Sequence, residues 1–187
     1  VTALTQSYNL ARLTNSRIVL LGIADNNNKP ELQKKLNELA NQSQKTAGIE
    51  IEVMVTETKE GYEEINRVAD LIGALFVIIG MESKMAFGNI KAAHAFRMVR
   101  ESVHPVITIR GNKHRDGCKT IMLPIDPSFQ SRQKVGKGLE LAKLFGATLK
   151  VVAVHTSSDE SIENKLLAYA NQSWKYIKSQ GVEATIK

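Results

Sequence analysis

Residues Arg17–Ala24 read RIVLLGIA, a continuous apolar run that ends at the turn-forming stretch Asp25–Asn28. A short apolar run closed by turn formers is typical of a β-strand that is buried on both faces of its sheet. Pro30 suits the first turn of a helix, and leucines follow it at helical spacing. The sequence therefore predicts a buried strand followed by an amphipathic helix over residues 30–47.

The same alternation of strand and helix continues along the chain. Gly48 is placed to end the helix. Further strands are predicted at 49–55, 75–80 and 105–109, with helices at 61–72 and 89–102. After a polar stretch the pattern restarts, with strands at 121–125, 148–155 and 182–187 and helices at 129–145 and 159–180. Alternating helices and nearly continuous apolar strands predict a doubly wound, mostly parallel α/β sheet.

One sequence unit occurs twice. Ala40–Ser43 (ANQS) recurs as Ala170–Ser173, and the apolar run Ile18–Ile23 aligns with Leu149–Val154 at nearly the same offset. The two copies of ANQS lie 130 residues apart. Solenoid repeats have much shorter periods, of roughly 20–50 residues. The repeat therefore predicts two domains in tandem.

Mapping the copies onto each other sets the expected boundaries. We expect domain 1 at 1–110 without its first strand, a linker at 111–119, and the N-terminal half of domain 2 at 120–187. The strand that opens domain 2 has its counterpart about ten residues before Val1 at the offset of the repeat. We therefore expect the natural polypeptide to extend beyond both ends. If the ends are natural, we expect strand exchange between chains, because sheet edges would be bare.

Composition narrows the class of protein. Hydrophobic content of 43% and charged content of 24% are ordinary for a soluble globular protein. No apolar run approaches the roughly 18 residues of a membrane span, so no membrane partner is expected. The net charge is +6, but Lys and Arg are scattered, so we expect no nucleic-acid partner. The single cysteine fits the reducing cytoplasm, the localisation we expect.

The stretch Leu123–Ser128 (LPIDPS) resembles the opening strand and turn of a universal stress protein domain. Residues 69–80 resemble the third helix and fourth strand of that family, and Pro105–Arg110 resembles its closing strand. The resemblance covers essentially the whole chain, as a tandem protein. It implies a five-stranded, mostly parallel α/β sandwich of the adenine-nucleotide-alpha-hydrolase-like type. It also implies a non-enzymatic stress-response binding or signalling module, with the two domains packed as an intrachain pseudo-dimer and a homodimer as a further assembly.

The resemblance also implies a nucleotide site. Many members of the family bind ATP at the carboxyl ends of the strands, where ligands sit in open α/β sheets. By resemblance Asp126 contacts the adenosine moiety, Pro124 and Ile125 flank the base, Ser128 belongs to the same turn, and Val154 offers a backbone contact to adenine. The phosphate half of this pocket would lie beyond Lys187. From the residues alone, Asp126 is also explained as a turn or helix-cap residue before Pro127.

The first copy departs from the family's phosphate signature, which is Gly-x-x-Gly, nine residues, then Gly-(Ser/Thr). Gly80 matches, but the second glycine is replaced by Ser83. The final pair falls on Ala93-His94 or Ala92-Ala93. Glycines let backbone N–H groups approach a phosphate, and these substitutions remove them. We therefore expect ATP in domain 2 only. Gly80 by itself is better explained as a close turn after a buried strand, because one glycine without its partners cannot build a phosphate cradle.

Two other functions remain open. One is a protein-interaction scaffold that binds no nucleotide, and the other is a nucleotide hydrolase on the same fold. A hydrolase would need a phosphate loop and a general base beside it, and the first copy offers neither. The four histidines are far apart in the sequence. We therefore expect no catalytic residue and no metal site.

Overall fold

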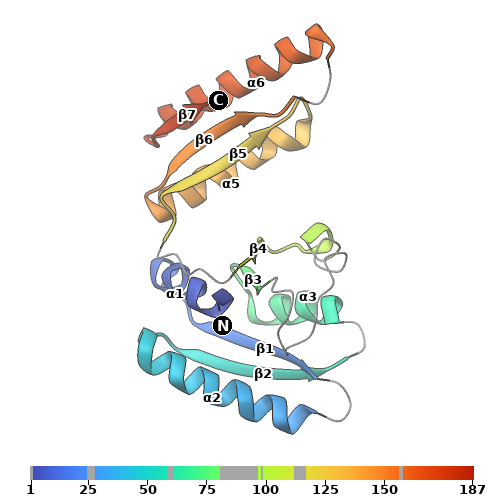
Figure 1. Ribbon diagram of the computed structural model, residues 1–187, viewed down its shortest axis with the longest axis vertical. Helices are drawn as coiled ribbons and strands as arrows, with labels where there is room; N and C mark the ends of the chain where they lie inside the picture. The colour runs from blue at the N-terminus through green and yellow to red at the C-terminus, as the bar shows by residue number, and fades with distance from the viewer. Residues whose placement is uncertain are drawn as a thin grey trace. The chain divides into compact units, whose positions relative to one another are not determined.

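The chain divides into two compact units, Val1–Asp116 and Gly117–Lys187. Both are drawn in the computed structural model of Figure 1. The first unit contains α1 (Thr2–Thr14), β1 (Ile18–Ala24), α2 (Lys29–Ala47), β2 (Ile51–Glu57), α3 (Gly61–Ile72), β3 (Val77–Gly80) and β4 (Val106–Ile109). The second contains β5 (Thr120–Ile125), α5 (Phe129–Phe145), β6 (Thr148–Ala153), α6 (Glu160–Ser179) and β7 (Ala184–Ile186). The residues described by the structure are 2–24, 28–58, 61–80, 97, 99–111, 117–155 and 158–187.

Every strand pairing in these ranges is parallel. The strands form three small sheets, ordered β1-β2, β3-β4 and β5-β6-β7. The parallel α/β class predicted from the sequence is therefore confirmed. The expected five-stranded sheet is seen only in parts, because within the described residues no strand joins β1 to β3.

Helices α2 and α6 bury the same positions of the repeated sequence unit. The buried side chains of α2 are Leu36, Ala40, Ser43 and Ala47. Those of α6 are Leu166, Ala170, Ser173 and Ile177. Each member of the second set lies 130 residues after its partner in the first. The ANQS repeat therefore marks one helix face that packs on a sheet twice. That the copies are two domains of a tandem protein stays a prediction.

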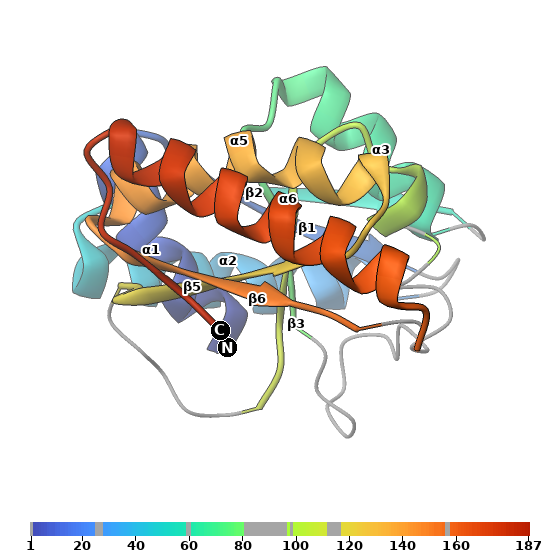
Figure 2. The same cartoon turned by 90° about the horizontal axis from the view of Figure 1, so that it is seen from above.

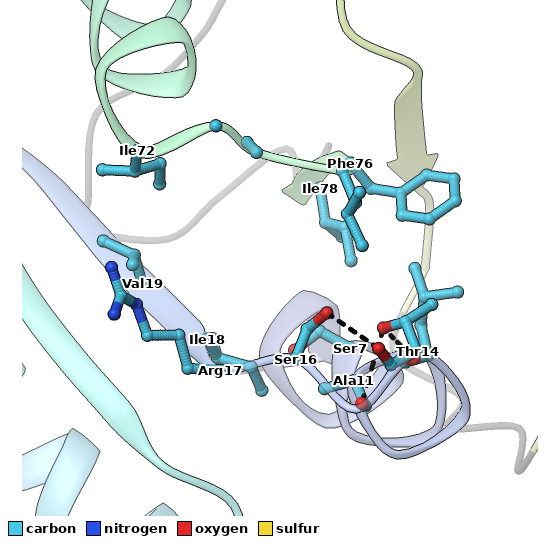
Figure 3. A pocket seen from close by; sticks show the side chains of 14 residues that line it. Ser7, Ala11, Thr14, Ser16, Arg17, Ile18, Val19, Ile72, Phe76 and Ile78 are labelled. Atoms are coloured by element: carbon cyan, nitrogen blue, oxygen red, sulfur yellow. Dashed lines mark hydrogen bonds between the residues drawn. The ribbon is translucent and has the colours of Figure 1, made fainter.

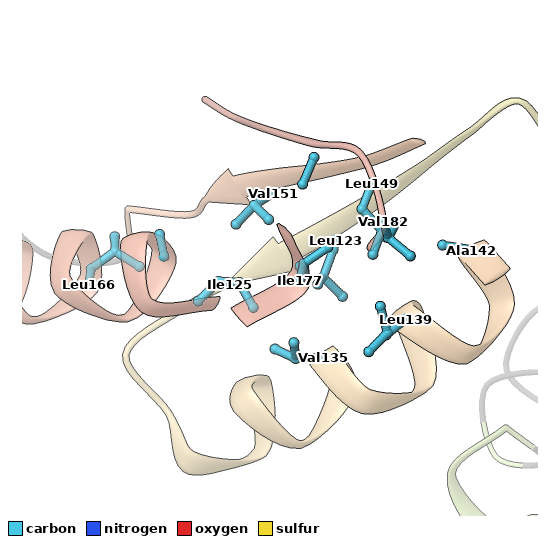
Figure 4. Close-up of a cluster of buried hydrophobic side chains, with 12 residues drawn as sticks. Leu123, Ile125, Val135, Leu139, Ala142, Leu149, Val151, Leu166, Ile177 and Val182 are labelled. Atoms are coloured by element: carbon cyan, nitrogen blue, oxygen red, sulfur yellow. The ribbon is translucent and has the colours of Figure 1, made fainter. Parts of the chain in front are cut away.

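The second unit has one hydrophobic core on one face of its sheet (Figure 4). Odd-numbered residues of β5 and β6 point into the core, and Ile125, Leu149 and Val151 are fully buried. Helices α5 and α6 lie side by side over this face (Figure 2). Burying one such side chain contributes about 1.5–3 kcal/mol, so the shared core holds both helices on the sheet.

Strand β5 lies at an edge of its sheet and contains Pro124. Thr148 N–H donates to the Lys119 carbonyl, so the odd-numbered residues of β5 direct their backbone groups to β6. Pro124 is even-numbered, so its missing N–H faces the unpaired edge. Proline is tolerated in a strand at such a position, because no ladder hydrogen bond is lost.

Helix ends follow the sequence signals closely. Gly48 and Gly146 adopt φ of 64° and 61° after α2 and α5, the left-handed conformation in which glycine ends a helix. The predicted helices at 61–72 and 129–145 have the bounds of α3 and α5. Helix α1 had no predicted counterpart. The predicted helix at 89–102 lies outside the described residues except at its C-terminal end, where 99–101 are helical.

Candidate functional site

The turn after β5 is organised by Asp126. Its Oδ1 accepts a hydrogen bond from Ser128 N–H at 2.8 Å, which closes a tight turn between the strand and α5. Hydrogen bonds from the side chain and backbone of Ser128, followed by Ser131 and the positive charge of Lys134, lower the pKa of the Asp126 carboxyl. The turn therefore holds a carboxylate that is ionised at neutral pH at the carboxyl end of β5.

The buried side chain of Ser131 stabilises this turn through hydrogen bonds to its backbone. Its side chain is 1% exposed. Ser131 Oγ accepts from Asp126 N–H at 3.0 Å and donates to the Pro124 carbonyl at 3.5 Å. Ser128 caps α5 by accepting from Ser131 N–H at 3.1 Å. The two serines thus fix the backbone that carries Asp126. Ser131 was not among the predicted site residues, and the Ser-x-x-Ser spacing after the aspartate is the signal that could have identified it.

Strand β6 ends beside this turn. Val154 follows β6, and its N–H donates to the Ile125 carbonyl at 2.8 Å. The structure therefore places Asp126, Ser128 and Val154 at the same edge of the sheet. Val154 is 39% exposed, but its N–H is engaged by the strand, so its carbonyl is the backbone group left for a ligand.

Pro124 and Ile125 differ in what they offer a ligand. Pro124 is exposed on the open face of β5. Ile125 is 0% exposed, and its side chain packs in the core of the second unit. The Ile125 side chain therefore contacts the core, not a base bound at the surface.

Aromatic and basic side chains surround the start of α5. The guanidinium of Arg132 lies over the Tyr169 ring at 4.3 Å from its centroid and over the Phe129 ring at 5.5 Å. Phe129 is 61% exposed. After the end of β6, His155 Nδ1 lies 3.7 Å from Glu163 Oε1. The helix N-terminus and the cations favour an anionic or hydrogen-bonding ligand.

Gly80, predicted as part of a phosphate site, is the last residue of β3 in the other unit. It lacks the positive φ that would require glycine. Among the described residues, a Cβ built there would meet the Ala3 Cβ, at an ordinary contact distance of 3.4 Å. The close turn offered as the alternative explanation would follow Gly80, in residues that lie outside the described ranges, so it stays a prediction. The other signature positions, Ser83 and residues 92–94, lie outside the described residues.

The first unit contains a cavity of about 370 Å³ between α1, β1 and residues 72–78 (Figure 3). Its lining is mainly apolar. The hydroxyls of Ser7, Thr14 and Ser16 all donate to backbone carbonyls of residues 4–14. Arg17 Nε lies 3.5 Å from Glu52 Oε2. The cavity thus lacks the convergent polar side chains that orient a small polar ligand.

Other site classes find no support in the residues described. There, no three His, Cys, Asp or Glu side chains are grouped so that they could hold a metal ion. None of the helices in those ranges combines the length and apolar character of a membrane span.

Comparison with known proteins gives the fold. No protein-family model and no curated protein matches the chain. A universal stress protein from Archaeoglobus fulgidus DSM 4304 superposes with a TM-score of 0.70 at 16% identity, over 98% of this chain and 70% of that one. A functionally unknown protein from Pseudomonas aeruginosa PAO1 superposes with a TM-score of 0.68 at 16% identity, over 98% and 68% of the two chains.

The parallel sheets and their helices define an α/β protein of the doubly wound class. The chain has, more narrowly, the fold of the universal stress proteins. This confirms the fold that the resemblance of residues 69–80, Pro105–Arg110 and Leu123–Ser128 implied.

Proposed function

We propose that the chain is a tandem universal stress protein that binds adenine nucleotide through the second unit and has no enzymatic activity. The observation that supports this most is the Asp126 turn. An ionised carboxylate is held by two serines at the carboxyl end of a parallel strand, beside the end of the next strand. Ligands of open α/β sheets bind at this edge. By resemblance, Asp126 is where the family contacts adenosine.

In this proposal each group at this edge has a role. The Asp126 carboxylate accepts hydrogen bonds from ribose hydroxyls, and the Val154 carbonyl accepts from the adenine amino group. The N-terminus of α5 and Lys134 make the surroundings favourable to negative charge. Pro124 provides an exposed apolar surface for the base. In this proposal the first unit binds no ATP, because its signature positions have lost two glycines.

A scaffold that binds no nucleotide is the second candidate, and two observations favour it. Val154 N–H is already bonded to Ile125, so an adenine ring finds one backbone partner there and not two. The Ile125 side chain is buried and cannot flank a base. Both candidates share the rest of the proposal, a cytoplasmic stress-response module whose domains form an intrachain pseudo-dimer or assemble as a homodimer.

A nucleotide hydrolase is supported less well. Ser128 Oγ is the acceptor of the α5 cap, and His155 faces Glu163. Neither arrangement pairs a nucleophile with a general base.

The test measures nucleotide retained by the protein. Purified protein is equilibrated with millimolar ATP, desalted and denatured, and the supernatant is analysed by ion-exchange chromatography. We expect nucleotide from the wild type and about tenfold less from Asp126→Asn, because a charge-assisted hydrogen bond is lost.

The matched control is Asp159→Asn. Asp159 Oδ1 accepts from Ser161 N–H at 2.8 Å, the same turn geometry at the start of α6. This variant should retain nucleotide. Equal retention by Asp126→Asn and the wild type, or none in any variant, would overturn the nucleotide proposal.

A further inference from the structure

Two exposed cations of the second unit meet at one aromatic ring between α5 and α6, the neighbouring helices of Figure 2. The guanidinium of Arg132 lies 4.3 Å from the centroid of the Tyr169 ring and 5.5 Å from that of the Phe129 ring. Lys165 Nζ lies 5.7 Å from the centroid of the same Tyr169 ring. Tyr169 packs against the core of the second unit, so its ring is a fixed support for both cations.

Neither cation has a carboxylate partner within the described part of the chain. On a helix surface such partners come from residues three or four positions away. Those positions hold Ser, Phe, Val and Gly around Arg132, and Ser, Ile, Ala and Tyr around Lys165. The first unit shows the contrast, because there Arg67 pairs with Glu64 three positions before it, at 2.6 Å. The donors of Arg132 and Lys165 thus remain to be matched by an acid group from outside.

The other cations in the first half of α5 have an acidic neighbour. The positive charge of Lys134 helps to lower the pKa of the Asp126 carboxyl, so the two lie near each other. Lys137 Nζ donates to Glu140 Oε2 at 2.7 Å. Uncompensated positive charge on this part of the surface is therefore concentrated at the Tyr169 ring. Such a concentration suits a single acid group better than nucleic acid, whose binding draws on cations along many phosphates.

One turn beyond Arg132, the same face of α5 is bare at Gly136, because residues four apart on a helix lie one above the other. Gly136 is exposed, and a Cβ built there would meet nothing within 4 Å. Its φ is not in the left-handed region either. Glycine in an exposed helix interior is less stable than alanine, so neither packing nor backbone conformation explains it. What a glycine does allow is the close approach of a second backbone.

We infer that the surface formed by Phe129, Arg132, Gly136, Lys165 and Tyr169, the α5–α6 face, binds an acidic segment of a partner protein. An Asp or Glu side chain of the partner accepts hydrogen bonds from the guanidinium of Arg132 and from Lys165. A guanidinium stacked on a ring keeps the N–H edge that matches a carboxylate. The partner backbone passes over Gly136, and the exposed Phe129 ring adds apolar contact. Arginine and aromatic side chains are enriched in the cores of protein interfaces.

The α5–α6 face is separate from the candidate nucleotide site. Tyr169 lies about two and a half turns into α6. The nucleotide proposal uses the ends of β5 and β6 instead. The inference therefore goes beyond the proposed function. Asp126→Asn, which is expected to lose nucleotide, should bind an acidic peptide like the wild type, so the two proposals stand or fall separately.

The test uses hexaglutamate with acetylated and amidated ends, titrated into the whole chain labelled with ¹⁵N. Hexaglutamine is its uncharged counterpart. We expect hexaglutamate to shift the side-chain Nε–Hε signal of Arg132 saturably, and hexaglutamine to leave it in place. Arg132→Gln should weaken hexaglutamate binding, followed at the Tyr169 amide, by about tenfold, because charge-assisted hydrogen bonds are lost. No saturable shift at Arg132 in the wild type would overturn the inference.

The matched control is Lys175→Gln, which removes one exposed cation of α6 outside the α5–α6 face. It should bind hexaglutamate like the wild type. Arg132→Lys keeps the charge without the planar fork and should restore only part of the binding. Equal weakening by Lys175→Gln and Arg132→Gln would show attraction to overall charge and would overturn the inference. So would tighter binding of octathymidylate than of hexaglutamate at the same ionic strength, which would assign the face to nucleic acid.

Gly136→Gln tests the bare part of the face. Glutamine favours a helix more than glycine does, so the urea midpoint of the Trp174 fluorescence should not fall. Its side chain covers the backbone, and hexaglutamate binding should weaken severalfold. Binding like that of the wild type would contradict the close approach inferred at Gly136. A lower urea midpoint in Arg132→Gln with unchanged hexaglutamate binding would reduce Arg132 to a link between the helices and overturn the inference.

Discussion

Asp126 combines a structural and a candidate ligand-binding role at one carboxylate. The hydrogen bonds from Ser128 that close the turn also lower its pKa. A group whose pKa is depressed on folding stabilises the folded state above its unfolded pKa, which is about 3.9 for aspartate. That stabilisation is lost as the pH falls through the lower pKa of the folded state.

This gives a prediction for the pH dependence of stability. Replacing Asp126 by asparagine removes its contribution, so the free energy of unfolding should fall less between pH 5 and pH 2 than in the wild type. Urea unfolding is followed by the fluorescence of Trp174, the single tryptophan, which lies in α6. Glu140→Gln, an exposed carboxylate on α5, is the control. An unchanged pH profile in Asp126→Asn would contradict the assignment.

Ser131 offers a second test at the residue scale. Ser131→Ala leaves the Asp126 N–H without its acceptor in a part-buried turn. An orphaned polar group of this kind costs about 1–3 kcal/mol. We therefore expect a lower urea midpoint for the Trp174 signal. Ser179→Ala, which removes an exposed hydroxyl at the end of α6, should leave the midpoint unchanged. Equal midpoints for Ser131→Ala and the wild type would contradict the role given to Ser131.

At the scale of elements, leucine side chains of α2 fill the space beside Gly22 of β1. A Cβ built on Gly22 would lie 2.5 Å from Leu36 Cδ1 and 3.1 Å from Leu32 Cδ2. Both leucines are on α2, so a side chain at Gly22 would have to displace the leucine side chains that pack against the strand.

We predict that Gly22→Val destabilises the first unit by about 1–3 kcal/mol through overpacking. Circular dichroism at the helical minimum during heating measures the loss. Gly136→Val is the control, because nothing lies within 4 Å of a Cβ built at Gly136. A Gly22→Val midpoint no lower than that of the control would show that α2 can move away without cost.

The elements that the sequence predicted share a strong local signal. Strand β1 is a continuous apolar run closed by turn formers, and α2 has Pro30 in its first turn and Gly48 after its last. Helix α1 was missed because it begins without an acidic first turn or a recognised cap. Its folding depends on tertiary contacts of Leu4 and Ala11 in two small clusters.

The candidate site could be predicted only in part, because some of its features have a local sequence signal and others depend on tertiary contacts. Asp126 and Ser128 stand out because Asp-x-Ser is a local turn signal. The role of Ser131 depends on the path of the turn, which brings its hydroxyl to the Asp126 N–H. The burial of Ile125 and the Ile125–Val154 hydrogen bond depend on the register of β5 with β6, which the sequence does not fix.

At the scale of the whole molecule, the two units have separate cores. The core of the second unit runs from Leu123 to Ala184, and the clusters of the first lie between Leu4 and Val53. No buried cluster among the described residues draws on both. Residues that share one core unfold cooperatively. Since the two units have separate cores, we expect each unit to unfold in its own transition.

This predicts that a core defect in one unit is confined to that unit. Gly22→Val should lower the midpoint of the first unit's transition, which is followed by circular dichroism. The transition of the second unit, which is followed by Trp174 fluorescence, should keep its midpoint. Leu166→Ala, which empties a fully buried site in α6, should lower the Trp174 midpoint by the equivalent of about 2–5 kcal/mol. A single transition in which both probes shift together in both variants would contradict the division.

The central claim is that adenine nucleotide binds at the end of β5, and amide chemical-shift mapping with ATP tests it most directly. We predict saturable shifts at the amides of Asp126, Ser128 and Val154, and none in residues 2–58. Shifts confined to other residues, or no shifts at millimolar ATP, would contradict it and leave the nucleotide-independent scaffold.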